Sequence, residues 1–309
     1  MQQWIDSFLK HVRFERNYSP HTVCSYQHDL KEFHAFLSRC RRDEVISPVE
    51  IDHLSIREFL GHLHQGGKQR STIARKLATL RSFFRFLHQE GVIQVNPARL
   101  VRTPRQDKSQ PRFLSREEVE IVLGLPGNKT DGGIRDCAIL EMLYATGMRI
   151  GELVGLNLED VALRERLVKV RGKGKKERLV PFGENAAKAL RSYLPVRKKL
   201  LRRSRRANHP NALFLNLQGG RITARSVQRN IRQYTRDAAL ALDVHPHLFR
   251  HSFATHLLNA GADLRSIQEL LGHETLATTQ KYTHLAIEQL IATYRSSHPR
   301  AKVVRSSPE

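Results

Sequence analysis

Two short segments of the chain combine cations with residues that could direct them at a bound anion. In ATGMRIGELVGL, Arg149 and Glu152 are three residues apart and share a helix face, so the carboxylate could orient the guanidinium toward a phosphate. An ordinary surface ion pair explains the same spacing and is the more frequent case. Lys173 follows Gly172 in a glycine-rich turn, where an ammonium could protonate a departing alkoxide but is more often only solvated. The turn lacks the earlier glycine and the following Ser/Thr of a nucleotide-binding P-loop.

The segment HPHLFRHSFATHLL carries a second group of polar side chains. Pro246 is typical of the first position of a helix, which puts His247 where free N–H groups and the helix dipole favour an anion. Arg250 lies three residues further on, so the two side chains point to the same side. His247 and His251 also have the spacing of metal ligands. No acidic residue joins them at metalloprotease spacing, and the arginine between them repels a cation, so we expect no metal site.

A further segment, DLRSIQELLGH, ends at a histidine that the core does not require. Asp263 is a typical helix cap and Gly272 a typical helix stop, so His273 should project just beyond the helix end. Tyr282 follows nine residues later, in TTQKYTHL. Taken alone, each of these two side chains is more often structural than catalytic.

Periodicity predicts that helices carry most of these side chains. A capping box formed by Ser115 and Glu118 should begin a helix. Two short strands at 167–171 and 178–180 should form a hairpin around the glycine-rich turn. Further helices are expected at 134–144, 150–156, 184–201, 223–242, 246–259, 263–271 and 286–296.

The first hundred residues indicate a separate, all-helical domain. Apolar residues at helical spacing predict helices at 4–12, from Pro20 onward, at 56–63 and at 71–90. The stretch NPARLVRTPRQDKSQPR, residues 96–112, holds three prolines and little apolar periodicity, which is typical of an extended linker. We therefore expect a domain at 1–95, a linker at 96–112 and a second domain at 113–309.

The composition favours a polyanionic partner. Lys and Arg number 52 against 30 Asp and Glu, a formal net charge of +22, whose self-repulsion a polyanion would offset. Nucleic acid is favoured over an anionic membrane because no apolar run is long enough to cross a bilayer, although a merely basic protein stays possible. Three cysteines without paired spacing and an N-terminus unlike a signal peptide indicate a reduced, cytoplasmic protein.

Six candidate side chains together match the pattern of one known family. In chain order they are Arg149, Lys173, His247, Arg250, His273 and Tyr282. The sequence resembles the tyrosine recombinase family and, within it, the Xer recombinases of the XerC type. The spacings agree, with 24 residues between the first two, 23 from the second arginine to the second histidine, and nine to the tyrosine. The likeness runs through YSPHTVCSYQHDL, GKGKKERLVPFG, RHSFATHLL and LLGHETLATTQKYTH to HPRAK; Met148 and Gly151 depart from the more usual residues.

The resemblance implies a mainly α fold that closes as a clamp around duplex DNA. A helical, SAM-like core-binding domain would precede a mostly helical catalytic domain with a small β-hairpin or sheet. Tyr282 would attack the scissile phosphate, form a 3′-phosphotyrosyl bond and release a 5′-hydroxyl, so that rejoining needs no ATP. Arg149 and Arg250 would neutralise the charge of the transition state, and Glu152 would orient Arg149.

The remaining roles also follow from the resemblance. Lys173 would be the general acid for the leaving 5′-oxygen, His247 would assist proton transfer at the nucleophile, and His273 would hydrogen-bond the phosphate. Cations and imidazoles take the place of a metal in this scheme, so we expect neither a metal nor any other cofactor.

The expected partners are a double-stranded recombination site and other recombinase subunits. Two protomers of this type and two of a XerD-like recombinase would form a heterotetramer that resolves chromosome and plasmid dimers at cell division, with a DNA translocase as a possible regulator. The segment from Ala286 onward would pack into a neighbouring protomer. One alternative is a phage or transposon integrase of the same family, although no room for an extra N-terminal arm-binding domain is expected. Another is a non-catalytic DNA-binding clamp, which should have lost one or more catalytic residues.

DNA binding should weaken steeply with salt. About 6–10 phosphate contacts would lower the affinity roughly 10³–10⁵-fold between about 50 and 200 mM salt, because each contact releases a condensed counterion. Fluorescence anisotropy of a labelled duplex across this range measures the dependence. A flat dependence would mean that the charge of +22 does not serve DNA binding.

Overall fold

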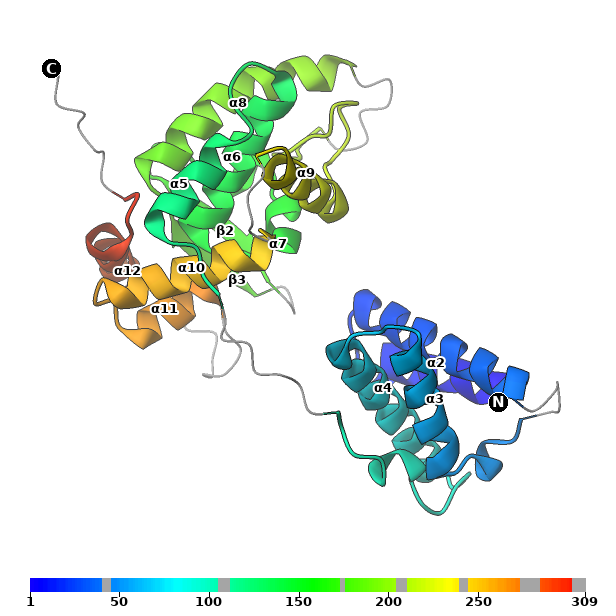
Figure 1. Ribbon diagram of the computed structural model, residues 1–309. Coiled ribbons are helices and arrows are strands. Elements are labelled where there is room, and N and C mark those ends of the chain that lie inside the picture. The colour runs from blue at the N-terminus through cyan, green and yellow to red at the C-terminus, as the bar shows by residue number, and fades with distance from the viewer. Residues whose placement is uncertain are drawn as a thin grey trace, which may run out of the picture. The chain divides into compact units, whose positions relative to one another are not determined.

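The computed structural model describes residues 1–40, 46–104, 112–172, 176–203, 210–238, 244–272 and 284–301. Over these residues the fold is mainly α-helical with one small antiparallel sheet (Figure 1). The chain divides into two compact units, Met1–Gln110 and Pro111–Glu309, and each has its own hydrophobic core. The mainly α class expected from the sequence is confirmed.

The described residues of the first unit form four α-helices around a core rich in aromatic rings. Its elements are α1 (Gln2–Lys10), a π-helical turn (His11–Glu15), α2 (Pro20–Cys40), a 3₁₀ turn (Pro48–Glu50), α3 (His53–Gln65), α4 (Arg70–Gln89) and a second 3₁₀ turn (Pro97–Arg99). Phe33 packs edge-on against Phe59 at 5.0 Å between ring centroids, and Phe83 against Phe84 at 5.4 Å. Edge-to-face contacts of this kind add to the free energy gained by burying the rings.

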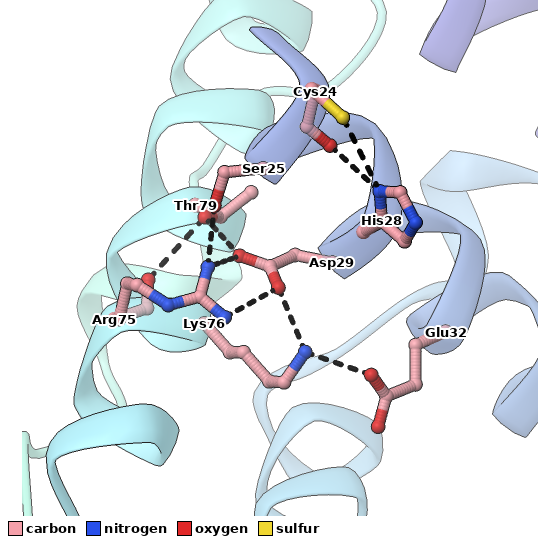
Figure 2. A network of polar contacts seen from close by, with 8 residues as sticks. All are labelled: Cys24, Ser25, His28, Asp29, Glu32, Arg75, Lys76 and Thr79. Carbon is pink, nitrogen blue, oxygen red and sulfur yellow. Dashed lines mark hydrogen bonds and ion pairs between the residues drawn. The ribbon is translucent and has the colours of Figure 1, made fainter. Parts of the chain in front are cut away.

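A buried polar network joins α2 to α4 (Figure 2). The carboxylate of Asp29 accepts hydrogen bonds from the Arg75 guanidinium, from Lys76 Nζ at 2.7 Å and from Thr79 Oγ1 at 2.9 Å. Lys76 Nζ also donates to Glu32 at 2.8 Å. The Asp29 side chain is only 2% exposed, so these partners replace its hydration. The network therefore fixes how the two helices pack.

The range 96–112, expected to be a linker, begins as part of the first unit instead. Ala98 and Val101 are buried in the core of this unit. Arg81 on α4 holds the segment, because its Nε donates to the carbonyl of Ala98 at 3.1 Å and its Nη2 to that of Val101 at 2.6 Å. Proline-rich sequence does not reveal such contacts, since they depend on a side chain far away in the chain. Residues 105–111 lie outside the described residues.

The second unit combines helices with a three-stranded antiparallel sheet of order β1-β2-β3 (Figure 1). Its elements are α5 (Arg116–Gly124), α6 (Asp131–Thr146), α7 (Ile150–Gly155), a 3₁₀ turn (Leu158–Asp160), β1 (Val161–Ala162), β2 (Leu167–Arg171), β3 (Glu177–Pro181), α8 (Glu184–Arg203), α9 (Ala224–Asp237), α10 (Pro246–Asn259), α11 (Leu264–Leu271) and α12 (His284–Ser297). The expected hairpin is β2 with β3, in which Val168 faces Val180. The two-residue strand β1 was not expected.

Helix α6 forms the centre of the second unit and leads the chain to Arg149. It is buried on nearly all sides and packs against α8 and α10, as an interior helix of a larger domain does. It ends at Gly147, which has the left-handed conformation (φ 59°). A Cβ at this position would lie 2.5 Å from Phe253 and 2.9 Å from Leu271. Glycine is therefore required here both for the turn and for the close packing of α10 and α11.

The end of α12 and the residues after it pack against their own unit. His298 is buried and stacks on Tyr294 with 4.7 Å between ring centroids, and burial lowers the pKa of His298 to about 3. Arg300 Nη2 donates to Glu141 Oε1 on α6 at 2.7 Å. Insertion of the segment from Ala286 onward into a neighbouring protomer stays a prediction. Across the described residues, no helix has the length and apolar character needed to span a membrane.

Replacing Asp29 with Asn should destabilise the first unit. The substitution removes the charge that partners Lys76, and breaking a buried ion pair costs about 3 kcal/mol or more. Urea unfolding can be followed through the fluorescence of Trp4, the only tryptophan of the chain, which packs against the core of this unit. The control is Glu32→Gln, which affects a side chain that is 43% exposed and should cost less than about 1 kcal/mol. Equal unfolding midpoints for the two variants would contradict this account.

Replacing Gly147 with Ala should destabilise the second unit by roughly 2–4 kcal/mol, because the left-handed conformation and the contact with Phe253 both oppose a Cβ. Gly151→Ala is the matched control. Nothing lies within 4 Å of a Cβ there, and alanine favours the helix α7. Thermal unfolding of the full chain, followed by circular dichroism, compares the two. The prediction fails if Gly147→Ala melts at the same temperature as Gly151→Ala.

Candidate active site

Arg149 is held at the beginning of α7 by Glu152. It is the N-cap residue of this helix, with extended backbone (φ −71°, ψ 148°). Glu152 accepts two hydrogen bonds from it, one from the backbone N–H at 2.8 Å and one from Nη1 at 3.0 Å. The Arg149 side chain is 44% exposed, whereas that of Glu152 is 7% exposed. The carboxylate is thus a buried support for a guanidinium that reaches solvent.

The same carboxylate binds a second arginine from β3. Arg178 Nη1 and Nη2 donate to the two oxygens of Glu152 at 3.0 and 2.8 Å, a bidentate pair. Burial by itself raises the pKa of Glu152, but the hydrogen bonds and charges of Arg178 and Arg149 outweigh it and hold that pKa below its usual value. Glu152 is therefore ionised at neutral pH.

Arg250 on α10 binds the carboxyl ends of two other helices. Its Nη1 donates to the carbonyl of Gly147, the C-cap of α6, at 2.8 Å. Its Nη2 donates to the carbonyl of Leu271, the last residue of α11, also at 2.8 Å. Carbonyls at helix ends lack intrahelical partners and carry the negative end of the helix dipole, so they are suited to a guanidinium.

Burial, together with the nearby charges of Arg149 and Arg178 and against the opposing charge of Glu152, lowers the pKa of Arg250 to about 10. The group remains charged at neutral pH. Three guanidiniums therefore surround one carboxylate, which leaves a surplus of two positive charges. Such an arrangement favours the binding of an anion with more than one oxygen, such as a phosphate.

His247 occupies the first turn of α10, one turn before Arg250. The helix begins at Pro246, as expected, and His245 caps it by accepting the N–H of Leu248 at its Nδ1 (3.2 Å). His247 is exposed. It therefore lies where the unpaired N–H groups of a helix N-terminus add to the attraction for an anion.

The other three candidate side chains, Lys173, His273 and Tyr282, lie outside the described residues. The residues that directly precede two of them are described. A Cβ on Gly172, which precedes Lys173, would lie 3.7 Å from Glu152 Oε1. A Cβ on Gly272, which precedes His273, would lie 3.1 Å from Arg178 Nη1. Gly172 and Gly272 therefore both lie beside the Glu152–Arg178 pair, one residue before Lys173 and His273 respectively.

The described residues contain no group of three or more His, Cys, Asp or Glu side chains that could hold a metal ion. Sequence reasoning missed one residue of this arrangement, Arg178. A signal for it existed, because in β3 Arg178 alternates with Leu179 and shares the buried face of Val180. An arginine on the core face of a strand requires a buried partner.

Comparison with known proteins assigns the chain to a family. Residues 112–289 match the phage integrase family, and residues 5–91 match the phage integrase N-terminal SAM-like domain. A tyrosine recombinase XerC from Pelotomaculum thermopropionicum is 47% identical over 303 residues, covering 96% of this chain and 98% of that protein. A tyrosine recombinase XerC from Bacillus subtilis is 41% identical, covering 97% of this chain and 98% of that protein.

Solved structures share the fold. A Tn1549 transposon integrase in complex with a circular intermediate DNA has a TM-score of 0.68 at 19% identity, covering 93% of this chain and 99% of that one. A lambda integrase dimer bound to a COC′ core site has a TM-score of 0.67 at 18% identity, covering 91% and 99%. The resemblance to recombinases of the XerC type is confirmed by the sequence relatives. The chain belongs to the phage integrase family and is a DNA recombinase of its tyrosine recombinase branch.

Proposed function

We propose that this recombinase cuts and rejoins DNA through a 3′-phosphotyrosyl bond to Tyr282, at a phosphate bound by Arg149 and Arg250. The observation that carries the proposal is the surplus of guanidinium charge around Glu152. The charge develops on the non-bridging oxygens of the phosphate in the transition state, and preorganised donors stabilise it there. Each arginine uses only some of its five N–H groups for the contacts described, so others remain for the phosphate.

The proposed cleavage forms one bond and breaks another. The Tyr282 oxygen attacks phosphorus while its proton passes toward His247, and the bond from phosphorus to the 5′-oxygen breaks. Lys173 gives a proton to that oxygen, which leaves as a hydroxyl. His273 hydrogen-bonds the phosphate. A 5′-hydroxyl of another strand then attacks the phosphotyrosyl bond, which conserves the energy of the original linkage, so the scheme requires neither ATP nor a metal.

The outer face of α9 supports DNA as the partner. Four arginines recur there at helical spacing, and all are exposed: Arg225, Arg229, Arg232 and Arg236. The opposite face is buried through Val227, Ile231 and Thr235. The eleven residue steps from Arg225 to Arg236 extend about 16 Å, so these four arginines can follow several phosphates of one strand.

The relatives named XerC support a cellular role and a cytoplasmic location. We propose that the chain acts with a XerD-like recombinase in a heterotetramer on duplex recombination sites. Its task is to resolve chromosome and plasmid dimers at cell division, with a DNA translocase as regulator. In this assembly the segment from Ala286 onward packs into a neighbouring protomer.

Trapping on a nicked recombination site tests the nucleophile. Loss of a small piece of DNA after cleavage prevents rejoining, so wild type should accumulate a covalent adduct visible on a denaturing gel. Tyr282→Phe should form none, while Tyr18→Phe, a change at an exposed tyrosine of the first unit, should behave as wild type. An adduct with Tyr282→Phe would exclude this tyrosine. DNA binding by wild type without any adduct, on every plausible site and with a XerD-like partner present, would favour a non-catalytic clamp.

A further inference from the structure

A buried arginine lies at the centre of the candidate site without being one of the six candidate catalytic side chains. The Arg178 side chain on β3 is 7% exposed, and a buried guanidinium is costly unless its N–H groups are bonded. Three of them are bonded here. Two bind the carboxylate of Glu152, and Nε donates to the carbonyl of Leu270 at 2.9 Å. One planar group thus joins β3 to α7 and to the end of α11.

The Arg178 side chain also lies close to two glycines. A Cβ on Gly272 would lie 3.1 to 3.3 Å from Nη1, Cδ and Cζ of Arg178, and Gly272 has the left-handed conformation (φ 67°). A Cβ on Gly172 would lie 3.9 Å from Nη1. The N–H of Gly172 closes the hairpin by donating to the carbonyl of Lys176 at 2.8 Å. Arg178 therefore lies beside the chain directly before two of the candidate side chains.

We propose that Arg178 is a positioning residue of the recombination reaction. It orients Arg149 through Glu152, and it fixes the backbone at Gly172 and Gly272, from which the chain continues to Lys173 and His273. It does not itself bind the phosphate, because its side chain is buried and three of its five N–H groups already have partners. This inference rests on the proposed function, which gives Lys173 and His273 their roles.

Lysine cannot take over this task in full. Its ammonium keeps the positive charge, so Glu152 stays paired, but a point charge does not reproduce a planar fork that reaches a carboxylate and a carbonyl at once. Arg178→Lys should therefore be intermediate between wild type and Arg178→Met. Both variants should bind duplex DNA as wild type does, because the residue is buried.

Single-turnover cleavage rates on two substrates distinguish a loss of positioning from a general loss of folded protein. On a nicked site with a normal scissile phosphate, Arg178→Met should cleave about 10–100-fold more slowly than wild type, the usual effect of losing a residue that orients a functional group. A second substrate carries sulfur in place of the scissile 5′-oxygen. Sulfur leaves without a proton, so this substrate does not require the general acid. On it, the deficit of both Arg178 variants should shrink.

Arg197→Met is the matched control. Arg197 is also a buried arginine bonded to carbonyls, with Nε donating to Ala212 at 2.8 Å and Nη2 to Pro210. It lies on α8, and it forms no hydrogen bond with Arg149, His247 or Arg250, the candidate side chains within the described residues. It should lower the melting temperature without changing the ratio of the two cleavage rates. A soluble Arg178→Lys keeps the test available if Arg178→Met does not fold.

The possible outcomes distinguish a failure of the role proposed for Arg178 from a failure of the proposed function. Cleavage by the Arg178 variants at the wild-type rate would overturn it, and so would a deficit that is equal on the two substrates. A shrinking deficit that Arg197→Met does not share would support it. If wild type itself forms no adduct on either substrate, the proposed function fails rather than the role of Arg178.

Discussion

The candidate active site depends on one buried carboxylate, that of Glu152, which lies near three guanidiniums. Glu152 binds both Arg149 and Arg178. Burial lowers the pKa of Arg250, and the charges of these two arginines lie close enough to lower it as well. One negative charge cannot neutralise three positive ones. The site therefore carries an excess of positive charge, which favours the binding of an anion such as the phosphodiester of DNA. In the proposed reaction these groups are fixed before the substrate arrives, so little reorganisation would be needed when the transition state forms.

The fold positions these charged groups by bringing the ends of several helices together. The carboxyl ends of α6 and α11 offer carbonyls to Arg250, and the beginning of α7 presents Arg149. Two left-handed glycines, Gly147 and Gly272, let these ends approach closely, since a Cβ at Gly147 would collide with Phe253 and one at Gly272 would lie only 3.1 Å from Arg178 Nη1. The hydrophobic core of the second unit holds the helices, and the polar groups lie where those helices begin and end.

Much of this helix arrangement was predictable from the sequence, because the signals that begin and end helices are local. The capping box at Ser115, the start at Pro246 and the stop at Gly272 are signals within a few residues, and the structure has all three. Contacts between distant residues were not predictable in this way. Arg81 draws residues 96–101 into the first unit, and the pairing of Glu152 with Arg178 across 26 residues came only from the structure. The roles of Lys173, His273 and Tyr282 stay predictions, because these residues lie outside the described part of the chain.

A double-mutant cycle of cleavage rates tests most directly whether Glu152 and Arg178 act as one unit. Glu152→Gln, Arg178→Met and the double variant are compared with wild type in single-turnover cleavage of one nicked site. Residues that act through a shared contact are not additive. The account predicts that the double variant is no slower than the slower single variant, since either change already removes the pair. Rate losses that multiply, as for independent sites, would contradict it.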